Sequence, residues 1–598
     1  MAAGHSQEQV DIVENPTGEH TCSSPSSTCS CSSSSIVTRL QEAKSNAVCS
    51  SGGDEYIIVK VSHMTKMWNV STRQHINSFP ECTGDLSMNK LEQRILSTSW
   101  NLSCKCCKFE GPKYRMYDTQ HADGPGVKPS TLNATLGLSL VASPIGASAF
   151  SEIFLTMGLF PGSLKGLTNL INSSAETVQR LGEENMAAER HKLAQYTDGV
   201  SVEVDTGYNN PLFGGTKTPF QYGTQSKSVM CENMTPEKKI IDVIIENKLC
   251  AVGARLRNKG EDVYCPNGHP GHCSATLAPT DPIGREGLAV EKSCEKLKAE
   301  GIKISTATMD GDGSKAGFIQ KVFPDVLCQR DSAHLGKALR NAVITADFSN
   351  NMFPGRLKAQ RTKSQQWLAN DVKQRCAAEM THGAKSVSHI SDHDSRTYQL
   401  CTLLSDTPQA IVDCYAGNCQ LCTSHSFACK GNGSYSWRKH FMSTESRNKL
   451  NMTDSDKQKL KDIILDKRLC PKKIGEAVLN ANTQKCESIM KCLTRSNPKS
   501  VTSSRNVAGR TLAGVLYANE GQIGRARILQ TAARHSVSGK ITKTHTARSN
   551  QREYLKAYKK RKDVIEKRVF SAVAKYRSYE NRTLRSTRDC YKQWKTHS

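Results

Sequence analysis

MDGDGSKAGFIQKVFPDVLCQRDSAHLGKAL, residues 309–339, is the stretch that decides how this chain is interpreted. The apolar, β-prone run before it includes Ile304 and Thr306 and predicts a strand that ends at Asp310. A carboxylate at the end of a strand sits on a rigid element at an edge open to solvent, which suits a catalytic divalent metal. A solvated Asp-Gly turn is the competing interpretation, and the DGD sequence by itself favours that turn.

Two further acids change this balance. The segment VSVEVD alternates apolar and polar residues up to Asp205, which ends a second predicted strand. Glu487 lies in NANTQKCESIMKCLTR, a segment of helical character. Three carboxylates from two strands and a helix form the platform of RNase H-like nucleases, where Mg²⁺ or Mn²⁺ neutralises the charge that gathers on a phosphate. The predicted fold class is therefore α/β with an RNase H-like catalytic core. Asp312 is the alternative to Asp310, and Glu476 and Glu520 are the alternatives to Glu487.

The composition favours a polyanionic partner. The 598 residues carry a formal net charge of +25, for which nucleic acid is the default partner and an anionic membrane surface the weaker one. The most apolar segment, 136–160, contains Pro144 and Glu152 and predicts packed helices rather than a membrane span. The N-terminus lacks a signal pattern, so we expect an intracellular protein. In a reducing compartment, the 24 cysteines are expected to be free thiols and zinc ligands rather than disulfides.

Composition shifts divide the chain into seven predicted parts. They are a disordered Ser-rich segment (1–53), a degenerate zinc-ribbon-like module (54–120), a helical DNA-binding or linker region (131–198), the first part of the RNase H-like core (199–345), a helical insertion containing Cys and His (346–470), the last part of the core (471–530) and a basic helical tail (536–598).

Three groups of Cys and His have spacings that favour zinc, which takes four soft ligands in a tetrahedron. Loops of free thiols are the alternative for each group. The first group, Cys82, Cys104 and Cys107, resembles a zinc ribbon that lacks one ligand, which Glu81 or a distant His would have to replace. The second group is Cys250, Cys265, His269 and Cys273, with His272 as an alternative ligand, and the third is Cys419, Cys422, His425 and Cys429, with Cys414 just before.

The C-terminal tail holds about half of the excess positive charge. Residues 540–595 contain eighteen Lys and Arg against five Asp and Glu, and an apolar residue recurs every seventh position from Tyr558. This pattern predicts an amphipathic helix that contacts the DNA backbone, with packing or dimerisation along its apolar seam. A solvated helix lying on the catalytic domain is the alternative. The cations chosen as DNA-binding candidates are Lys559, Lys560, Arg561, Lys562, Lys567 and Arg568.

The order of these motifs resembles the Mutator-like DDE transposases (MULE), in particular the proteins of invertebrate genomes with a Mutator-like transposase domain. In that pattern an Asp is followed by a Pro fourteen residues later, here Asp310 and Pro324, and then by Cys-x-x-His, here Asp331 to His334. VSVEVDTGY and TQKCES match the motifs of the first and last acids. HPGHCSATL and HSFACKGNGSYSW match two Cys-containing elements, and the resemblance covers roughly residues 56–525.

The resemblance implies a DNA transposase of the cell nucleus that acts as a homo-oligomer on double-stranded DNA. Its expected reaction is metal-dependent hydrolysis and strand transfer at transposon terminal repeats. His334 is expected to orient the scissile phosphate or a metal-bound water, or merely to cap its helix, and Asp331 to support His334. Two departures from the family pattern, Asp331 in place of Cys and Lys485-Cys486 beside the last acid, motivate an alternative. That alternative is an inactive, domesticated, zinc-containing DNA-binding protein.

Overall fold

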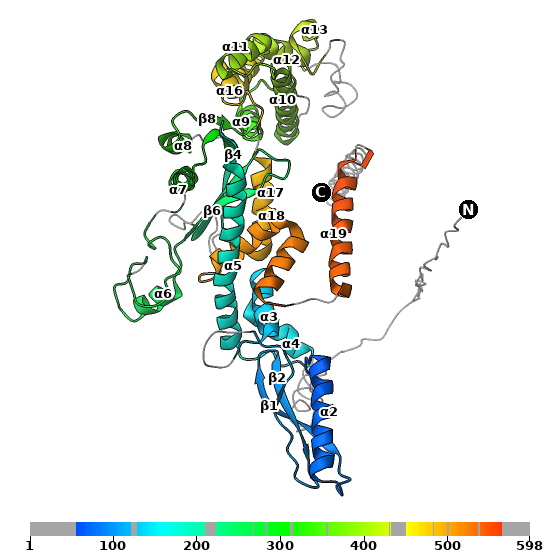
Figure 1. The fold of residues 1–598 in the computed structure, drawn as a ribbon. Coiled ribbons are helices and arrows are strands. Elements are labelled where there is room, and N and C mark those ends of the chain that lie inside the picture. The colour runs from blue at the N-terminus through cyan, green and yellow to red at the C-terminus, as the bar shows by residue number, and fades with distance from the viewer. Residues whose placement is uncertain are drawn as a thin grey trace, which may run out of the picture. The chain divides into compact units, whose positions relative to one another are not determined.

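The computed structural model describes residues 56–120, 128–209, 223–266, 268–281, 283, 285–310, 315–353, 357–429, 431, 450–481, 483–498, 501–535, 539–561 and 563–564 (Figure 1). By its contacts the chain divides into Met1–Tyr56 and Ile57–Ser598, and every element named below belongs to the second part. The predicted Ser-rich segment 1–53 lies outside the described residues, as do Asp312, Lys562, Lys567 and Arg568.

A five-stranded mixed sheet carries the first two predicted acids. Its strands are β4 (Val200–Tyr208), β5 (Gln225–Glu232), β6 (Ile240–Asn247), β7 (Ile304–Met309) and β8 (Leu327–Arg330). They lie in the order β6-β5-β4-β7-β8, in which the pairs β6–β5 and β5–β4 are antiparallel and the pairs β4–β7 and β7–β8 are parallel. The strands expected at Asp205 and Asp310 are thus β4 and β7, and they are hydrogen-bonded neighbours. Asp310 directly follows β7 as predicted, but the prediction that Asp205 ends its strand is wrong, because pairing with β5 continues β4 to Tyr208.

Helices cover both faces of this sheet. Neighbouring residues of a strand point to opposite faces, so Met230 of β5 joins one apolar cluster while Val229 and Cys231 join another. The first cluster includes residues of α7 (Glu286–Ala299) and α8 (Ala316–Val322), and the second includes residues of α17 (Gln484–Ser496) and α18 (Val507–Ala532). The long helix α5 (Leu164–Leu193) contributes to both clusters, and α6 (Ala251–Asn258) follows β6.

A helical region with its own core lies between β8 and α17 in the sequence. It consists of α9 (Ser332–Thr345), α10 (Lys358–Ser386), α11 (His393–Leu404), α12 (Thr407–Tyr415), α13 (Cys422–His425), α15 (Asp454–Ile464), the π-helical turn η1 (Leu465–Leu469) and α16 (Pro471–Gly475). Leu368, Val372 and Met380 recur along one side of α10 and are fully buried in an apolar cluster that also contains residues of α9, α11 and α15. The region therefore has enough apolar burial to hold its own shape.

The N-terminal module has far less apolar packing. It comprises α2 (Val61–Ser78) and a small sheet of β1 (Leu86–Arg94), β2 (Ser97–Cys104) and β3 (Tyr114–Arg115). Among the described residues its buried apolar cluster holds Met67, Leu102 and Met116. The next helices, α3 (Thr131–Val141) and α4 (Ala147–Thr156), instead pack with α5 and α18 in a larger cluster.

The described part of the C-terminal tail is one exposed helix, α19 (Gly539–Lys560), which buries none of its residues. In the described ranges no helix is both long and apolar enough to cross a membrane.

Candidate active site

The register of the sheet brings Asp205 and Asp310 together. In the parallel pair β4–β7, Val202 lies beside Ala307 and Glu203 beside Thr308. Continued by two residues, the same register places Asp205 of β4 beside Asp310, which follows β7. Two carboxylates from positions far apart in the sequence therefore lie side by side on two inner strands, near the carboxyl ends of these strands.

His334 connects this pair to the third predicted acid. Its Nε2 lies 3.5 Å from Asp310 Oδ1 and 3.8 Å from Glu487 Oε1. His334 is in the first turn of α9 and Glu487 in the first turn of α17, so two helix N-termini face the sheet edge at this point. The Glu487 side chain is half exposed, while Asp205 is buried. The structure thus brings together all four residues that we predicted to be catalytic.

The two aspartates are in an environment that disfavours their negative charge. Burial and the neighbouring Asp310 raise the pKa of Asp205 to about 6, against the opposing effect of Lys315. Burial also raises the pKa of Asp310, against the opposing charges of His334 and Lys315. Among the described residues, Asp310 Oδ1 is buried and accepts no hydrogen bond. Buried carboxylates with a free acceptor oxygen fit a divalent cation that prefers oxygen ligands.

Asp331 ties the two helices of the site to each other. It is fully buried, and its carboxylate accepts a hydrogen bond from Ala333 N at 2.6 Å, which caps α9. The same side chain accepts hydrogen bonds from Thr483 Oγ1 at 2.6 Å and Thr483 N at 3.2 Å, just before α17. One ligand atom each of Asp310, Asp331 and His334 also lies within 4.8 Å of the others. These hydrogen bonds join the start of the helix that carries His334 to the start of α17. The expected role of Asp331 in supporting His334 stays a prediction.

Two residues near the acids, Lys315 and Glu286, were not predicted from the sequence. Lys315 is almost fully buried, with its Nζ 2.5 Å from Glu286 Oε2, and Tyr208 donates a hydrogen bond to Glu286 Oε1 at 2.6 Å. The Lys315 charge favours ionised Asp205 and Asp310, whereas Glu286 disfavours both. No motif marks either residue, and the one available signal was the position of Lys315 shortly after Asp310.

A cavity of about 670 Å³ opens beside the acids. Asp205 and Glu487 line one part of it, and Met490 and Val501 give it apolar walls. Lys227 and Lys491 also line it, which adds positive charge next to the carboxylates. A cavity with acids at one end and cations on its walls can accept a phosphate-bearing ligand.

The second predicted cysteine group comes together as predicted. One ligand atom each of Cys250, Cys265, His269 and Cys273 lies within 4.8 Å of the others, and Cys250 Sγ is 3.2 Å from His269 Nε2. Burial raises the pKa of Cys250, but backbone hydrogen bonds from Gly253 and the contact with His269 contribute to a net lowering to about 6. His272, the alternative ligand, is not a member of the group. Four soft ligands at this spacing are suited to zinc.

The third group assembles with a different fourth member. The sulfur atoms of Cys414, Cys419, Cys422 and Cys429 lie within 4.8 Å of one another. His425 is not a member, and its Nδ1 instead lies 3.4 Å from Asp406 Oδ2. The short helix α13 carries both Cys422 and His425, and it directs the thiol to the group and the imidazole to Asp406.

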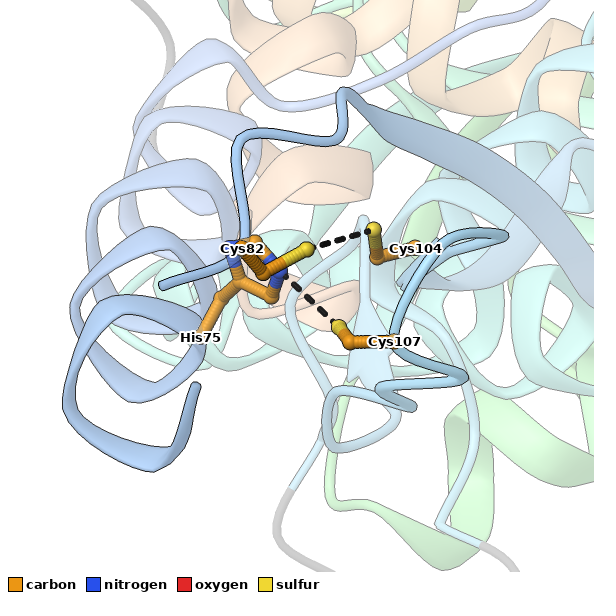
Figure 2. A group of neighbouring side chains, drawn as sticks. All are labelled: His75, Cys82, Cys104 and Cys107. Carbon is orange, nitrogen blue, oxygen red and sulfur yellow. Dashed lines mark hydrogen bonds between the residues drawn. The ribbon is translucent and has the colours of Figure 1, made fainter. Parts of the chain in front are cut away.

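The first group is completed by a histidine, which the sequence analysis considered as a substitute without naming His75. Cys82 Sγ lies 3.7 Å from Cys104 Sγ, and His75 Nε2 lies 3.2 Å from Cys107 Sγ (Figure 2). Ligand atoms of all four residues are within 4.8 Å of one another. Glu81, the substitute considered from the sequence, is exposed and not a member. His75 lies seven residues before Cys82, and this proximity was the available signal.

The basic tail is only partly described. Lys559 and Lys560 lie exposed in the last turn of α19. Arg561 pairs with Asp563 at 3.1 Å and lies over the Tyr558 ring, 5.6 Å from its centroid. The three candidate residues Lys562, Lys567 and Arg568 fall outside the described part, so DNA contact by the tail stays a prediction.

A comparison with protein families gives one match. The family model described as Mutator-like transposase matches residues 55–429, which is more than half of the chain. The matched range contains Asp205, Asp310, His334 and all three Cys-rich groups, and it ends before Glu487. No curated protein matches the chain.

Proposed function

The chain belongs to the Mutator-like transposase family, and from this premise we propose that it cleaves and joins DNA at the ends of a transposon. The proposed reaction is phosphodiester hydrolysis followed by strand transfer, with double-stranded terminal repeats as the substrate. The observation that carries the proposal is the contact of His334 with both Asp310 and Glu487, together with Asp205 beside Asp310 on the neighbouring strand.

We propose that the three acids are the metal ligands. The buried, unbonded Oδ1 of Asp310 and the raised pKa of Asp205 both fit residues that would hold Mg²⁺ or Mn²⁺. When bound, such ions activate the attacking oxygen and neutralise the charge on the leaving oxygen. Asp205 and Asp310 hold their positions through the sheet, and Glu487 closes the site from α17. Lys315 offsets part of the negative charge of the aspartates before any cation arrives.

His334 is proposed to position the scissile phosphate or the attacking water. Its Nε2 faces Asp310 and Glu487, so a group bound between these acids comes within reach of the imidazole. Asp331 holds the helix that carries it, through the cap at Ala333 and the hydrogen bonds from Thr483. This arrangement supports a positioning role for Asp331 rather than a ligand role.

The proposed fold of the core is RNase H-like. The support for it is the strand order β6-β5-β4-β7-β8, in which three antiparallel strands precede two parallel ones, together with the acids at adjacent strands. On this proposal residues 346–470 of the helical region are an insertion, and the core consists of residues 199–345, which include α9, and residues 471–530, which include α16. The domain boundaries on either side remain proposals as well.

The proposed DNA path includes the cavity lined by Lys227 and Lys491 and the basic helix α19. Lysines that contact phosphates release bound cations from DNA, so affinity is expected to fall steeply with salt. Zinc in the second and third Cys-rich groups, assembly as a homo-oligomer on DNA and location in the nucleus complete the proposal.

The test is cleavage of DNA that carries the repeats flanking the gene, in the presence of Mn²⁺. Asp310→Asn is expected to abolish cleavage and to leave DNA binding unchanged, because the amide keeps the size of the side chain and removes its charge. Asp325→Asn changes an exposed acid of the same stretch and serves as the matched control. Cleavage that persisted in Asp310→Asn would refute the assignment.

One observation favours the alternative, a DNA-binding protein without catalysis. The family match ends before Glu487, and Cys486 beside it is fully buried, with its sulfur 3.5 Å from Cys231 Sγ. The segment around the last acid thus serves the packing of the sheet. Tight, salt-sensitive DNA binding by the unmodified chain without any Mn²⁺-dependent cleavage would support this alternative.

A further inference from the structure

We propose that His75, Cys82, Cys104 and Cys107 form a structural zinc site that fastens the N-terminal module. The spacing of the cysteines alone left this site one ligand short. The imidazole of His75, at the end of α2, supplies the fourth donor (Figure 2). The proposal concerns the module alone and does not depend on the proposed catalytic activity.

The geometry of the four donor atoms fits a tetrahedron. With zinc–sulfur bonds of about 2.3 Å, the edge between two sulfur ligands of a tetrahedral site is about 3.8 Å. Cys82 Sγ and Cys104 Sγ are separated by 3.7 Å. His75 Nε2 is 3.2 Å from Cys107 Sγ, and all four donors lie within 4.8 Å of one another. The four donors are therefore close enough to one another to share a single ion.

The chemistry of the donors selects the metal. Three thiols and one imidazole are soft ligands, which favour zinc over magnesium or calcium. Four protein ligands also fill a tetrahedral site completely, and a closed site of this kind is structural rather than catalytic. We therefore assign the group to zinc as a stabilising ion.

The surroundings shape this group closely. A Cβ on Gly84 would lie 2.6 Å from Cys106 Cβ and 2.8 Å from Cys104 Sγ, so a glycine is needed where the loop after Cys82 passes the other sulfur. The His75 ring packs edge-on against Phe109, with centroids 5.2 Å apart. Since Cys104 N donates to Phe109 O at 3.0 Å, the turn that holds two of the thiols also orients the imidazole.

The module needs such a fastening. Its apolar cluster has three buried members, Met67, Leu102 and Met116, with seven partly buried hydrophobic residues packed against them, which is small for a unit of one helix and three strands. The four ligands join three separate segments, namely the end of α2, the loop before β1 and the turn after β2. Binding energy gained by a zinc ion at that junction becomes folding energy of the module.

The decisive experiment measures zinc per chain in the full-length protein after purification. His75→Ala is expected to bind one zinc fewer than the unmodified chain, because three ligands and water hold the ion poorly. His75→Cys restores a fourth soft ligand and is expected to retain the full zinc content. Cys106→Ser is the matched control, since Cys106 is exposed and adjacent to a ligand without belonging to the group.

A second measurement avoids variants that fail to fold. In the unmodified, zinc-loaded chain, a thiol-alkylating reagent followed by peptide mass spectrometry is expected to modify Cys106 rapidly and to leave Cys82, Cys104 and Cys107 protected. Chelation should expose these three thiols. Equal alkylation of all four cysteines before chelation, or an unchanged zinc content in His75→Ala, would overturn the proposal.

Discussion

The acid cluster on the central sheet and the Cys/His group of the N-terminal module are held in place by different means. The acids come from β4, from the residue after β7 and from α17, and apolar clusters on both faces of the sheet fix these elements. The ligands of the module lie between His75 and Cys107, around a cluster of three buried apolar residues. In the first region, apolar packing holds the functional side chains in place. In the second region, the proposed metal ligands hold the segments of the module together.

This difference has a direct consequence for substitutions. A side chain that a well-packed sheet merely displays can be changed at little cost to stability. Removal of a side chain that acts as a metal ligand in a weakly packed module is expected to unfold that module. The following predictions test both halves of this comparison.

The largest expected effect is a loss of activity without a loss of fold. Asp205→Asn should slow Mn²⁺-dependent cleavage by roughly 10³-fold or more, because several kcal/mol of charge stabilisation through the metal are lost. The unfolding temperature should not fall, since asparagine can still accept the hydrogen bond from Thr206 N and carries no buried charge. Cleavage kinetics and calorimetry on the same preparation check both points, with exposed Asp198→Asn as the control. A large drop in unfolding temperature would contradict the comparison.

The reverse is expected in the module. Cys104→Ser should make the segment 57–120 at least about tenfold more sensitive to limited proteolysis, because the zinc-dependent folding energy is lost. The five-stranded sheet should keep its resistance to proteolysis, because Cys104 does not belong to the apolar clusters on its two faces. Time courses by mass spectrometry would locate the cuts, and Cys106→Ser should behave like the unmodified chain. Equal sensitivity of sheet and module would argue against an independent role for the ligands.

An intermediate effect is expected at Asp331, which belongs to the acid cluster but also holds structure. Asp331→Ala should lower the free energy of unfolding by about 2–4 kcal/mol, because the cap of α9 is lost and Thr483 is left without its buried acceptor. Asp331→Asn should cost less, because an amide oxygen can replace one of these acceptors. Denaturant titration measures both variants. Equal costs for the two substitutions would show that charge rather than hydrogen bonding matters here.

The smallest effect concerns Asp371, a partly buried acid outside both sites. Burial raises the pKa of Asp371 to about 6, although Tyr415 and Arg375 oppose this shift. The folded protein therefore holds the proton more tightly than the unfolded chain, and the resulting stability, present below about pH 4, is lost as the pH rises through about 6.

Asp371→Asn should thus raise the free energy of unfolding by about 1–3 kcal/mol at pH 7.5 and change it little at pH 4. Urea titrations at the two pH values measure the difference. Asp394→Asn, at a side chain that is 98% exposed, is the control. A gain of the same size at both pH values would exclude ionisation as the cause. The result also calibrates how much an acid with the pKa of Asp205 costs the fold when it has no ligand role.

The sequence predicted the acid cluster better than the ligand groups. Alternating patterns locate β4 and β7, and both patterns stop near a carboxylate, so the parallel pairing of those strands suffices to bring Asp205 to Asp310. The burial of Lys315 against Glu286 could not be predicted, because it depends on how α7 and α8 pack on the sheet.

The ligand groups depend on local backbone direction, which spacing does not specify. His75 lies in the last turn of α2, whereas Cys107 lies in the turn after β2, so no short motif connects the two residues. His425 fits the spacing of its group, but the turn of α13 directs it to Asp406, and Cys414 at the end of α12 joins the group. Spacing therefore predicted the existence of each group and left one member of two groups undetermined.

The hydrogen bonds at Asp331 have a further consequence for the helical region between β8 and α17. Arg330 N donates to Glu476 O at 2.7 Å and Ser332 N to Ala481 O at 3.2 Å, so the chain leaves the sheet and returns to it at nearly the same point. Asp331 and Thr483, 152 positions apart, are the two ends of a closed loop. Because the entropy of loop closure grows only with the logarithm of length, this excursion costs about 2–3 kcal/mol more than a ten-residue turn. A change in the length of this loop beyond α9 therefore costs little closure entropy, and Glu487 still returns to its place beside His334.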